Sequence, residues 1–159
     1  MSLLCLGNTA MTTKNKILVG ALEQCDLPEL GIFGIHARVD TGATTSSLHV
    51  DNIEEFKKNN RRWVTFDIHP DIHNVSQVIR VSAPLKGKKT VKSSSADRQR
   101  RLVIETLVRF GEAEWKINIT LSDRAEMSYL MLLGREAMKN RIIVDPSHDY
   151  LFSNQQGSG

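Results

Sequence analysis

Val39-Asp40-Thr41-Gly42-Ala43 begins at the last residue of the segment 31–39, which alternates in the period-2 manner of a half-buried β-strand. A carboxylate at the end of a buried strand costs free energy unless backbone N–H groups and hydroxyls bind it. Gly42 and Ala43 leave room for such a turn, and the hydroxyl of Thr41 can hydrogen-bond to a neighbouring loop. Taken in isolation, the stretch also fits an Asx turn that merely ends a strand.

A second stretch, Met131-Leu132-Leu133-Gly134-Arg135, favours a functional role for Asp40 over a simple Asx turn. Residues 129–133 form a continuous apolar run of the kind that a fully buried strand shows, and a short helix is predicted over residues 135–140. Together the two stretches resemble the retropepsin-like aspartic proteases. In that group an Asp-Thr-Gly loop is followed late in the chain by two apolar residues, a glycine and a helix.

A closer resemblance covers nearly the whole domain. The segments that carry it are residues 37–43, 93–101, 115–121, 131–135 and 144–146. They look like a bacterial retropepsin-like family whose members are often labelled ATP-dependent zinc proteases, and which is associated with ATP-grasp glutamate ligases. The chain contains neither a His-Glu-x-x-His zinc motif nor a Walker phosphate loop. We therefore expect no metal and no cofactor.

The resemblance implies one catalytic carboxylate per chain, at Asp40. The residues expected to support it are Thr41, Gly42, Ala43, Leu133 and Gly134, with Ser46 and Ser47 as hydrogen-bonding groups behind the loop. One Asp cannot be general base and general acid in the same step, so the chemistry needs a second carboxylate from a second chain. The expected enzyme is a homodimer in which two Asp40 side chains share one proton.

Two positions depart from the retroviral pattern. Retroviral enzymes place an Asp after the Asp-Thr-Gly-Ala stretch, where it pairs with the Arg that matches Arg135, but this chain has Thr44. Arg135 must therefore find another partner. The flaps of such enzymes also carry glycines, whereas the predicted flap tip, residues 93–98, has none.

The fold class predicted for the chain is all-β, a closed acid-protease barrel with one or two short helices. The domain is expected over residues 16–153, between disordered tails at 1–15 and 154–159. Asp51 and Glu54 form a capping-box pattern that predicts a helix over residues 51–59. A long mobile hairpin or loop is predicted over residues 82–99. Strands are predicted over residues 16–20, 31–39, 62–69, 75–81, 101–110, 114–121, 129–133 and 141–144.

Composition limits the class of protein. The 159 residues, 40% hydrophobic and 25% charged, suit one globular domain. No apolar run approaches the roughly 18 to 20 residues of a membrane span, so no membrane contact is expected. Two cysteines are too few for a disulfide scaffold. We expect reduced thiols in a cytoplasmic protein, and Cys25 is interpreted as a buried or loop thiol.

The net charge of +3 is unevenly distributed. Residues 80–101 carry eight Lys and Arg against Asp97 alone, a net +7, which leaves −4 for the remainder. Three interpretations stay open for this stretch: a solvated flap, a surface for an acidic peptide, or a nucleic-acid contact. The stretch has no aromatic residue, which makes nucleic acid unlikely as a partner. The substrate-binding residues expected in the flap are Arg98, Arg100 and Arg101.

Histidines offer one rival site. His69 and His73 flank Pro70 and Asp71, a spacing that on a helix could bring two metal ligands together, but Pro70 argues against a helix. A solvated loop is the simpler interpretation.

Two functional classes remain. The first is a homodimeric aspartic endopeptidase acting on a peptide or protein substrate, with acidic or glutamylated peptides as one option. The second is a non-catalytic barrel of the same fold that binds a peptide or protein through its cleft.

Overall fold

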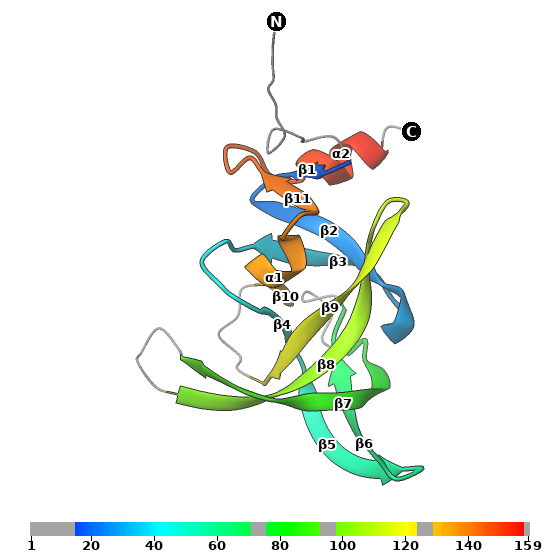
Figure 1. Ribbon diagram of the computed structural model, residues 1–159. Helices are drawn as coiled ribbons and strands as arrows, with labels where there is room; N and C mark the ends of the chain where they lie inside the picture. Colours follow the sequence, from blue (N-terminus) through cyan, green and yellow to red (C-terminus); the bar gives the residue numbers. More distant parts are fainter. Residues whose placement is uncertain (1–14, 71–75, 93–97, 124–128, 158–159) are drawn as a thin grey trace, which may run out of the picture.

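The protein is a closed β-barrel in the computed structural model, which describes residues 15–70, 76–92, 98–123 and 129–157 (Figure 1). Strand β2 pairs with β8 at Asp26 and Arg109, and this pairing closes the barrel. The predicted all-β barrel with two short α-helices is confirmed. In order around the barrel, the strands are β2 (Leu22–Leu27), β3 (Ile32–Val39), β10 (Met131–Leu133), β4 (Ser46–His49), β9 (Ala113–Ser122) and β8 (Arg98–Phe110).

The remaining elements extend the barrel at two ends (Figure 1). Beyond β8 the sheet continues through β7 (Ile79–Lys92), β6 (Arg61–Ile68) and β5 (Asp51–Lys58). At the other end, β1 (Ile17–Val19) pairs in parallel with β11 (Ile142–Val144). The helical elements are η3 (Pro28–Leu30), α1 (Arg135–Met138) and α2 (Leu151–Gly157).

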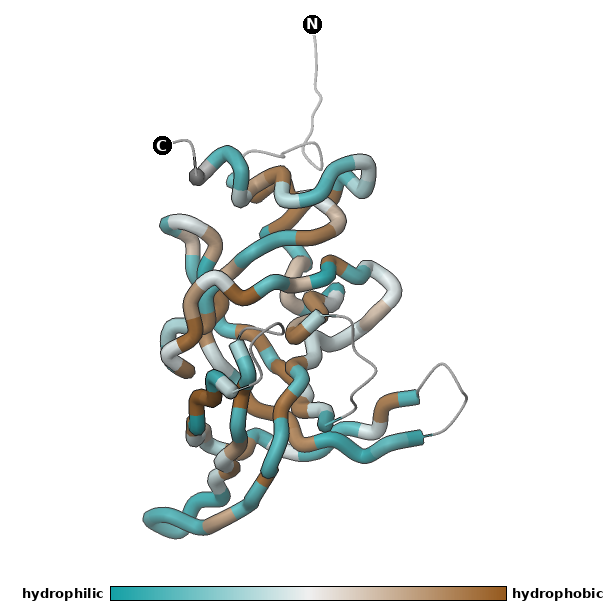
Figure 2. Tube along the Cα trace, turned by 180° about the vertical axis from the view of Figure 1, so that it is seen from behind, coloured by the Kyte–Doolittle hydropathy of each residue, from teal (hydrophilic) through white to brown (hydrophobic). Residues whose placement is uncertain are grey.

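The core extends from the barrel strands to β6. Its largest fully buried side chains include Phe66, Phe110, Ile104 and Leu133. Figure 2 shows hydrophobic residues along the barrel strands, while the turn of the β5–β6 hairpin is hydrophilic. Among the described residues, neither helix has the length and hydrophobicity that crossing a lipid bilayer requires.

The helix predicted over residues 51–59 is wrong, because this segment is strand β5. The carboxylates of Asp51 and Glu54 do not cap a backbone turn but bind His69, just after β6, and Arg80 on β7. The segment ends at Asn59-Asn60, both in the left-handed region at φ of 53° and 62°. Two such residues between paired strands form the turn that matches the twist of a β-hairpin.

The segment predicted as a long mobile hairpin or loop, residues 82–99, consists mostly of paired strand. β7 and β8 run antiparallel from the Leu85–Ile104 pair to the Lys92–Arg98 pair, with a bulge between Leu85 and Gly87. Residues 93–97, at the predicted tip, lie outside the described residues.

The C-terminal tail predicted over residues 154–159 is wrong for its first four residues, which belong to α2. The cause is Glu23, which is fully buried on β2. Its carboxylate accepts the backbone N–H groups of Gly20, Phe152 and Ser153 and the hydroxyl of Ser153, over 2.7–3.0 Å. A carboxylate at a helix N-terminus satisfies N–H groups that would otherwise lack partners. The predicted N-terminal tail lies almost wholly within residues 1–14, which are outside the described residues.

We predict that Glu23→Gln destabilises the domain by about 2–3 kcal/mol, because an amide NH₂ group would replace one acceptor oxygen among buried donors. Urea unfolding followed by circular dichroism measures the loss. The matched control is Glu112→Gln on the exposed β8–β9 turn, which should change stability by less than about 0.5 kcal/mol. Equal stability of the two variants would contradict a capping role for Glu23.

Candidate active site

The Asp40 loop is built around strand β10, which lies between the two strands that flank the loop in sequence. β10 pairs in parallel with β3, with Leu133 opposite Val39, and antiparallel with β4, with Leu132 opposite Ser47. The Asp40 N–H donates to the Leu133 carbonyl over 2.9 Å. The chain after β3 therefore has to turn around the end of β10 before it returns as β4.

The Asp40 carboxylate is fixed by its own loop. The N–H of Gly42 donates to Asp40 Oδ1 over 2.8 Å, and the N–H of Ala43 donates to the Asp40 carbonyl over 3.2 Å. A Cβ at Gly42 would lie 3.1 Å from the same carboxylate oxygen, so glycine allows this close approach. Asp40 is half-buried, and its second carboxylate oxygen accepts no hydrogen bond within the described part of the chain.

Helix α1 holds the loop from the other side. Backbone N–H groups of Arg135 and Glu136 donate to the carbonyls of Ala43 and Thr44 over 2.8 and 2.9 Å. The Arg135 guanidinium donates to the Thr41 carbonyl over 2.9 Å and to Thr44 Oγ1 over 3.1 Å. Arg135 thus keeps its contact with position 44 although a hydroxyl stands there in place of a carboxylate.

Gly134 is required by the packing of the loop. Its N–H donates to the hydroxyl oxygen of buried Ser46 over 3.0 Å, which confirms the role expected of Ser46. A Cβ at position 134 would lie 2.7 Å from the Thr45 carbonyl carbon and 3.0 Å from the Ser46 nitrogen. Both are backbone atoms that cannot move aside, so the apolar strand must end in glycine here.

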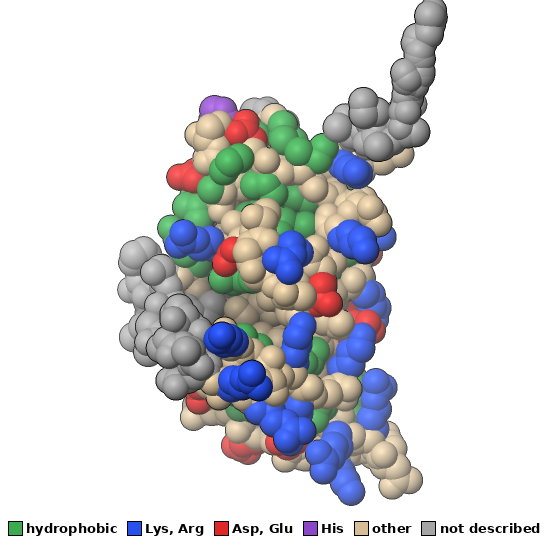
Figure 3. All heavy atoms as spheres, turned by 60° about the vertical axis from the view of Figure 1, so that its left-hand side comes forward, with side chains coloured by type: hydrophobic (Ala, Val, Ile, Leu, Met, Phe, Trp, Pro, Cys, Tyr) green, Lys and Arg blue, Asp and Glu red, His purple; other side chains and the backbone are tan. Residues whose placement is uncertain are grey.

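A cleft of about 640 Å³ opens beside Asp40. One wall is the Asp40 loop, and the other is the outer part of the β7–β8 hairpin, which contributes residues 89–92 and Arg101. Figure 3 shows Lys and Arg side chains gathered over the lower part of this face, below a hollow. Three cations of the hairpin, Lys89, Lys92 and Arg101, therefore line the same cleft as Asp40.

The residues expected in the flap do not all lie in this cleft. Arg101 lines it, whereas Arg98 and Arg100 are exposed and outside its lining. Sequence reasoning missed Lys89 and Lys92, which do line it. The signal that could have found them was the strand pairing of residues 87–92 with residues 98–103, which the interpretation of the stretch as a possible loop hid.

A second groove, about 620 Å³, lies on the other side of the loop. It is lined by Thr41 and Arg135 at its loop end and by Met138, Ile142 and Val144 farther away. The Thr41 hydroxyl makes no hydrogen bond within the described part of the chain, so it is available to a molecule in the groove.

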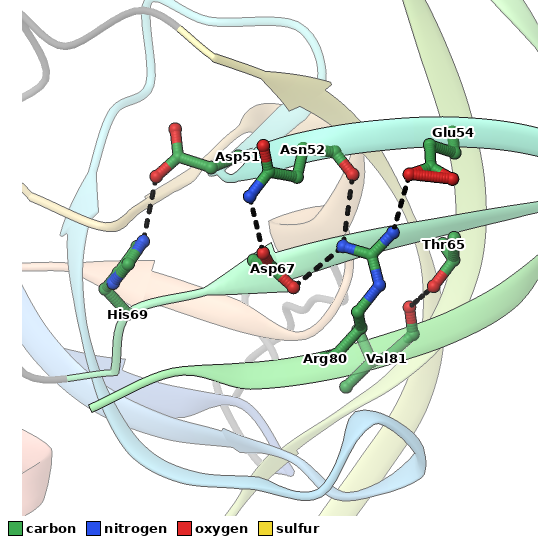
Figure 4. A network of polar contacts seen from close by, with 8 residues as sticks. All are labelled: Asp51, Asn52, Glu54, Thr65, Asp67, His69, Arg80 and Val81. Atoms are coloured by element: carbon green, nitrogen blue, oxygen red, sulfur yellow. Dashed lines mark hydrogen bonds and ion pairs between the residues drawn. The ribbon is translucent and has the colours of Figure 1, made fainter. Parts of the chain in front are cut away.

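The rival histidine site is a structural network (Figure 4). His69 Nε2 lies 2.8 Å from Asp51, and His73 is outside the described residues. Beside this pair, hydrogen bonds from Asn52 and then Arg80 hold the pKa of Asp67 below its usual value. No group of three or more His, Cys, Asp and Glu among the described residues could hold a metal ion.

Cys25 is buried, at 3% exposure, next to the Met131 sulfur. Burial, and then the charges of Asp26 and Glu23, raise the pKa of its thiol. A thiol held neutral in this way is a poor nucleophile.

Comparisons with known proteins agree with this geometry. The chain matches the model of the RimB-like family, described as the retropepsin-like aspartic endopeptidase RimB, over residues 18–155. A crystal structure of Lpg0085 from Legionella pneumophila, a protein of unknown function, is similar with a TM-score of 0.72 and 26% identity. The similarity covers 87% of this chain and 99% of the Lpg0085 chain.

Two curated relatives are longer proteins. A probable alpha-L-glutamate ligase from Parasynechococcus marenigrum is 47% identical over 82% of this chain, and one from Desulfotalea psychrophila is 44% identical over 83%. The matching segment is only 28% of the length of each relative. The similarity therefore concerns one part of those proteins.

We predict that Gly134→Ala destabilises the domain by about 1–3 kcal/mol, because its Cβ would collide with the backbone at Thr45. Thermal unfolding measures the loss. The matched control is Gly87→Ala, since a Cβ there meets nothing within 4 Å. If both variants unfolded at the same temperature, the close packing of Gly134 would not constrain the fold.

Proposed function

The chain belongs to the RimB-like family of retropepsin-like aspartic endopeptidases, and from this we propose that it hydrolyses peptides as a homodimer with one Asp40 from each chain. The observation that carries the proposal is the Asp40 carboxylate, fixed through one oxygen at the edge of a peptide-sized cleft. The sequence has one Asp-Thr-Gly stretch, and a second copy of the chain would supply a second carboxylate of this kind.

In the proposed reaction, water lies between the two Asp40 carboxyl groups. The ionised one takes a proton from water as the oxygen attacks the peptide carbonyl carbon. The protonated one donates a hydrogen bond to the carbonyl oxygen, and a proton then passes to the leaving amine as the C–N bond breaks. No covalent intermediate with the enzyme is formed.

The groove beside Thr41 supports the dimer. It begins at the Asp40 loop and continues over Met138, Ile142 and Val144, so a second copy seated there would stand next to Asp40. The apolar residues supply area to bury, and the free Thr41 hydroxyl supplies a directional contact. A peptide substrate fits the groove less well, because the cleft with the carboxylate lies on the other side of the loop.

The charges of the cleft favour an acidic peptide as substrate. Among its lining residues, Lys89, Lys92 and Arg101 outnumber the one carboxylate of Asp40. Two relatives that share this segment are named probable alpha-L-glutamate ligases. A domain that occurs within such proteins and has a cationic cleft fits a glutamate-containing peptide.

We predict that Asp40→Asn retains the fold and lowers the rate of peptide hydrolysis by about 100- to 10,000-fold, because the general base is lost. Internally quenched peptides with glutamates on both sides of the cleaved bond measure the rate. Asp149→Asn, an exposed position outside the cleft, is the control. If Asp40→Asn were as active as the control, Asp40 would not be the base; if the unmodified chain bound these peptides without cleaving any, the non-catalytic barrel would be the better description.

We predict that Thr41→Val raises the dimer dissociation constant about fivefold, since the variant keeps the side-chain size and removes one neutral hydrogen bond. Ile142→Asp should leave only monomers, because a carboxylate would be buried in an apolar contact. Sedimentation velocity over a range of concentrations tests both, with Val78→Asp as an exposed control and circular dichroism to check folding. Peptidase activity per chain that does not change on dilution into the monomer range would refute the dimeric site.

A further inference from the structure

Lys89 of the β7–β8 hairpin is held against the Asp40 loop by a contact of three side chains. Thr45 Oγ1 donates a hydrogen bond to Oε1 of Glu136 over 2.8 Å, and the Lys89 ammonium donates to the same hydroxyl oxygen. Lys89 Nζ lies 3.9 Å from that Glu136 oxygen. A hydroxyl has one proton to give and two lone pairs, so Thr45 serves both neighbours at once. The contact joins the hairpin, the loop and helix α1.

This contact stands between the cleft and the groove. Thr45 and Lys89 line the cleft that contains Asp40, whereas Glu136 lines the groove on the other side of the loop. Thr44 lines both. The Lys89 ammonium is therefore a cation of the cleft that is bound to the loop carrying Asp40.

The ion pair between Lys89 and Glu136 is weak enough for another anion to replace Glu136. The side chains of Lys89 and Glu136 are 39% and 51% exposed, and ion pairs of this exposure contribute little to stability. Lys86, on the same strand, has its own ion pair with Glu105 and a hydrogen bond to Asn118, both outside the cleft. Lys88, also on this strand, pairs with Glu55 outside the cleft, whereas Lys89 lines the cleft and pairs with Glu136.

We propose that Glu136 is an internal counterion that occupies Lys89 until a carboxylate of the substrate replaces it. Lys89 is then a specificity-determining residue that binds an acidic side chain next to the cleaved bond. Glu136 weakens this binding, because the substrate carboxylate has to displace it from Lys89. When the substrate carboxylate replaces Glu136, the hairpin is also released from the Asp40 loop. A peptide without a carboxylate does not break the contact between Lys89, Thr45 and Glu136. This inference rests on the proposed function, because it assigns the cleft beside Asp40 to the substrate.

Peptide binding tests the exchange without turnover. In the Asp40→Asn chain, fluorescence anisotropy gives the affinity for a labelled pentaglutamate peptide and for its pentaglutamine analogue. We expect Glu136→Gln to tighten binding of the pentaglutamate peptide about three- to fivefold and to leave the other peptide unchanged. Lys89→Met should weaken pentaglutamate binding by a similar factor, and Lys86→Met, the matched control, should not.

The double variant is decisive. If Glu136 acts by occupying Lys89, Glu136→Gln has no effect once Lys89 is Met, whereas a general effect of the lost charge would persist. Such persistence, an equal shift for both peptides, or no pentaglutamate binding by any variant would overturn the proposal. Sedimentation run alongside separates these effects from dimerisation, since Glu136 lines the groove. If the unmodified chain hydrolysed neutral peptides and Glu136→Gln did not change peptide binding, the exchange of Glu136 for a substrate carboxylate would be refuted. The proposed peptidase function would still stand.

Discussion

The exchange of backbone hydrogen bonds between the Asp40 loop and the β10–α1 turn is the constraint on which the rest of the structure depends. The N–H of Asp40 donates to the Leu133 carbonyl, and the N–H of Arg135 donates to the Ala43 carbonyl. These bonds fix the loop from both sides, and they require Gly134 because its neighbours are backbone atoms. A carboxylate that must keep one place in a cleft is best held in this way, since backbone groups cannot change rotamer.

The two sides of the loop have different chemical character, which fits different partners. The cleft has a hairpin wall with Lys89 and Lys92, and the groove is apolar around Met138 and Ile142. The charged cleft suits a charged ligand that binds and leaves. The apolar groove suits a permanent partner such as a second copy of the chain. The loop between them contributes residues to both surfaces.

The sequence predicted the parts whose residues have local reasons to be where they are. Asp40, Gly42 and Gly134 are required by turns and close approaches, and the apolar run at Met131 could only be a buried strand. The rest depended on contacts distant in sequence. Asp51 and Glu54 look like a helix cap but bind His69 and Arg80, which are 18 and 26 residues farther along the chain. The end of the chain is helical because Glu23, about 130 residues earlier, accepts its N–H groups.

The position of β10 has a consequence for how the protein folds. Thr41 and Arg135, which are in contact at the site, are 94 residues apart in the chain. Strand β10 has to insert between β3 and β4, and it pairs with β3 in parallel. Contacts of such long range form slowly. During synthesis the hairpins β5–β6 and β8–β9 can form while Asp40 still lacks its support. The carboxylate would then gain its support last, only after strand β10 and helix α1 have left the ribosome.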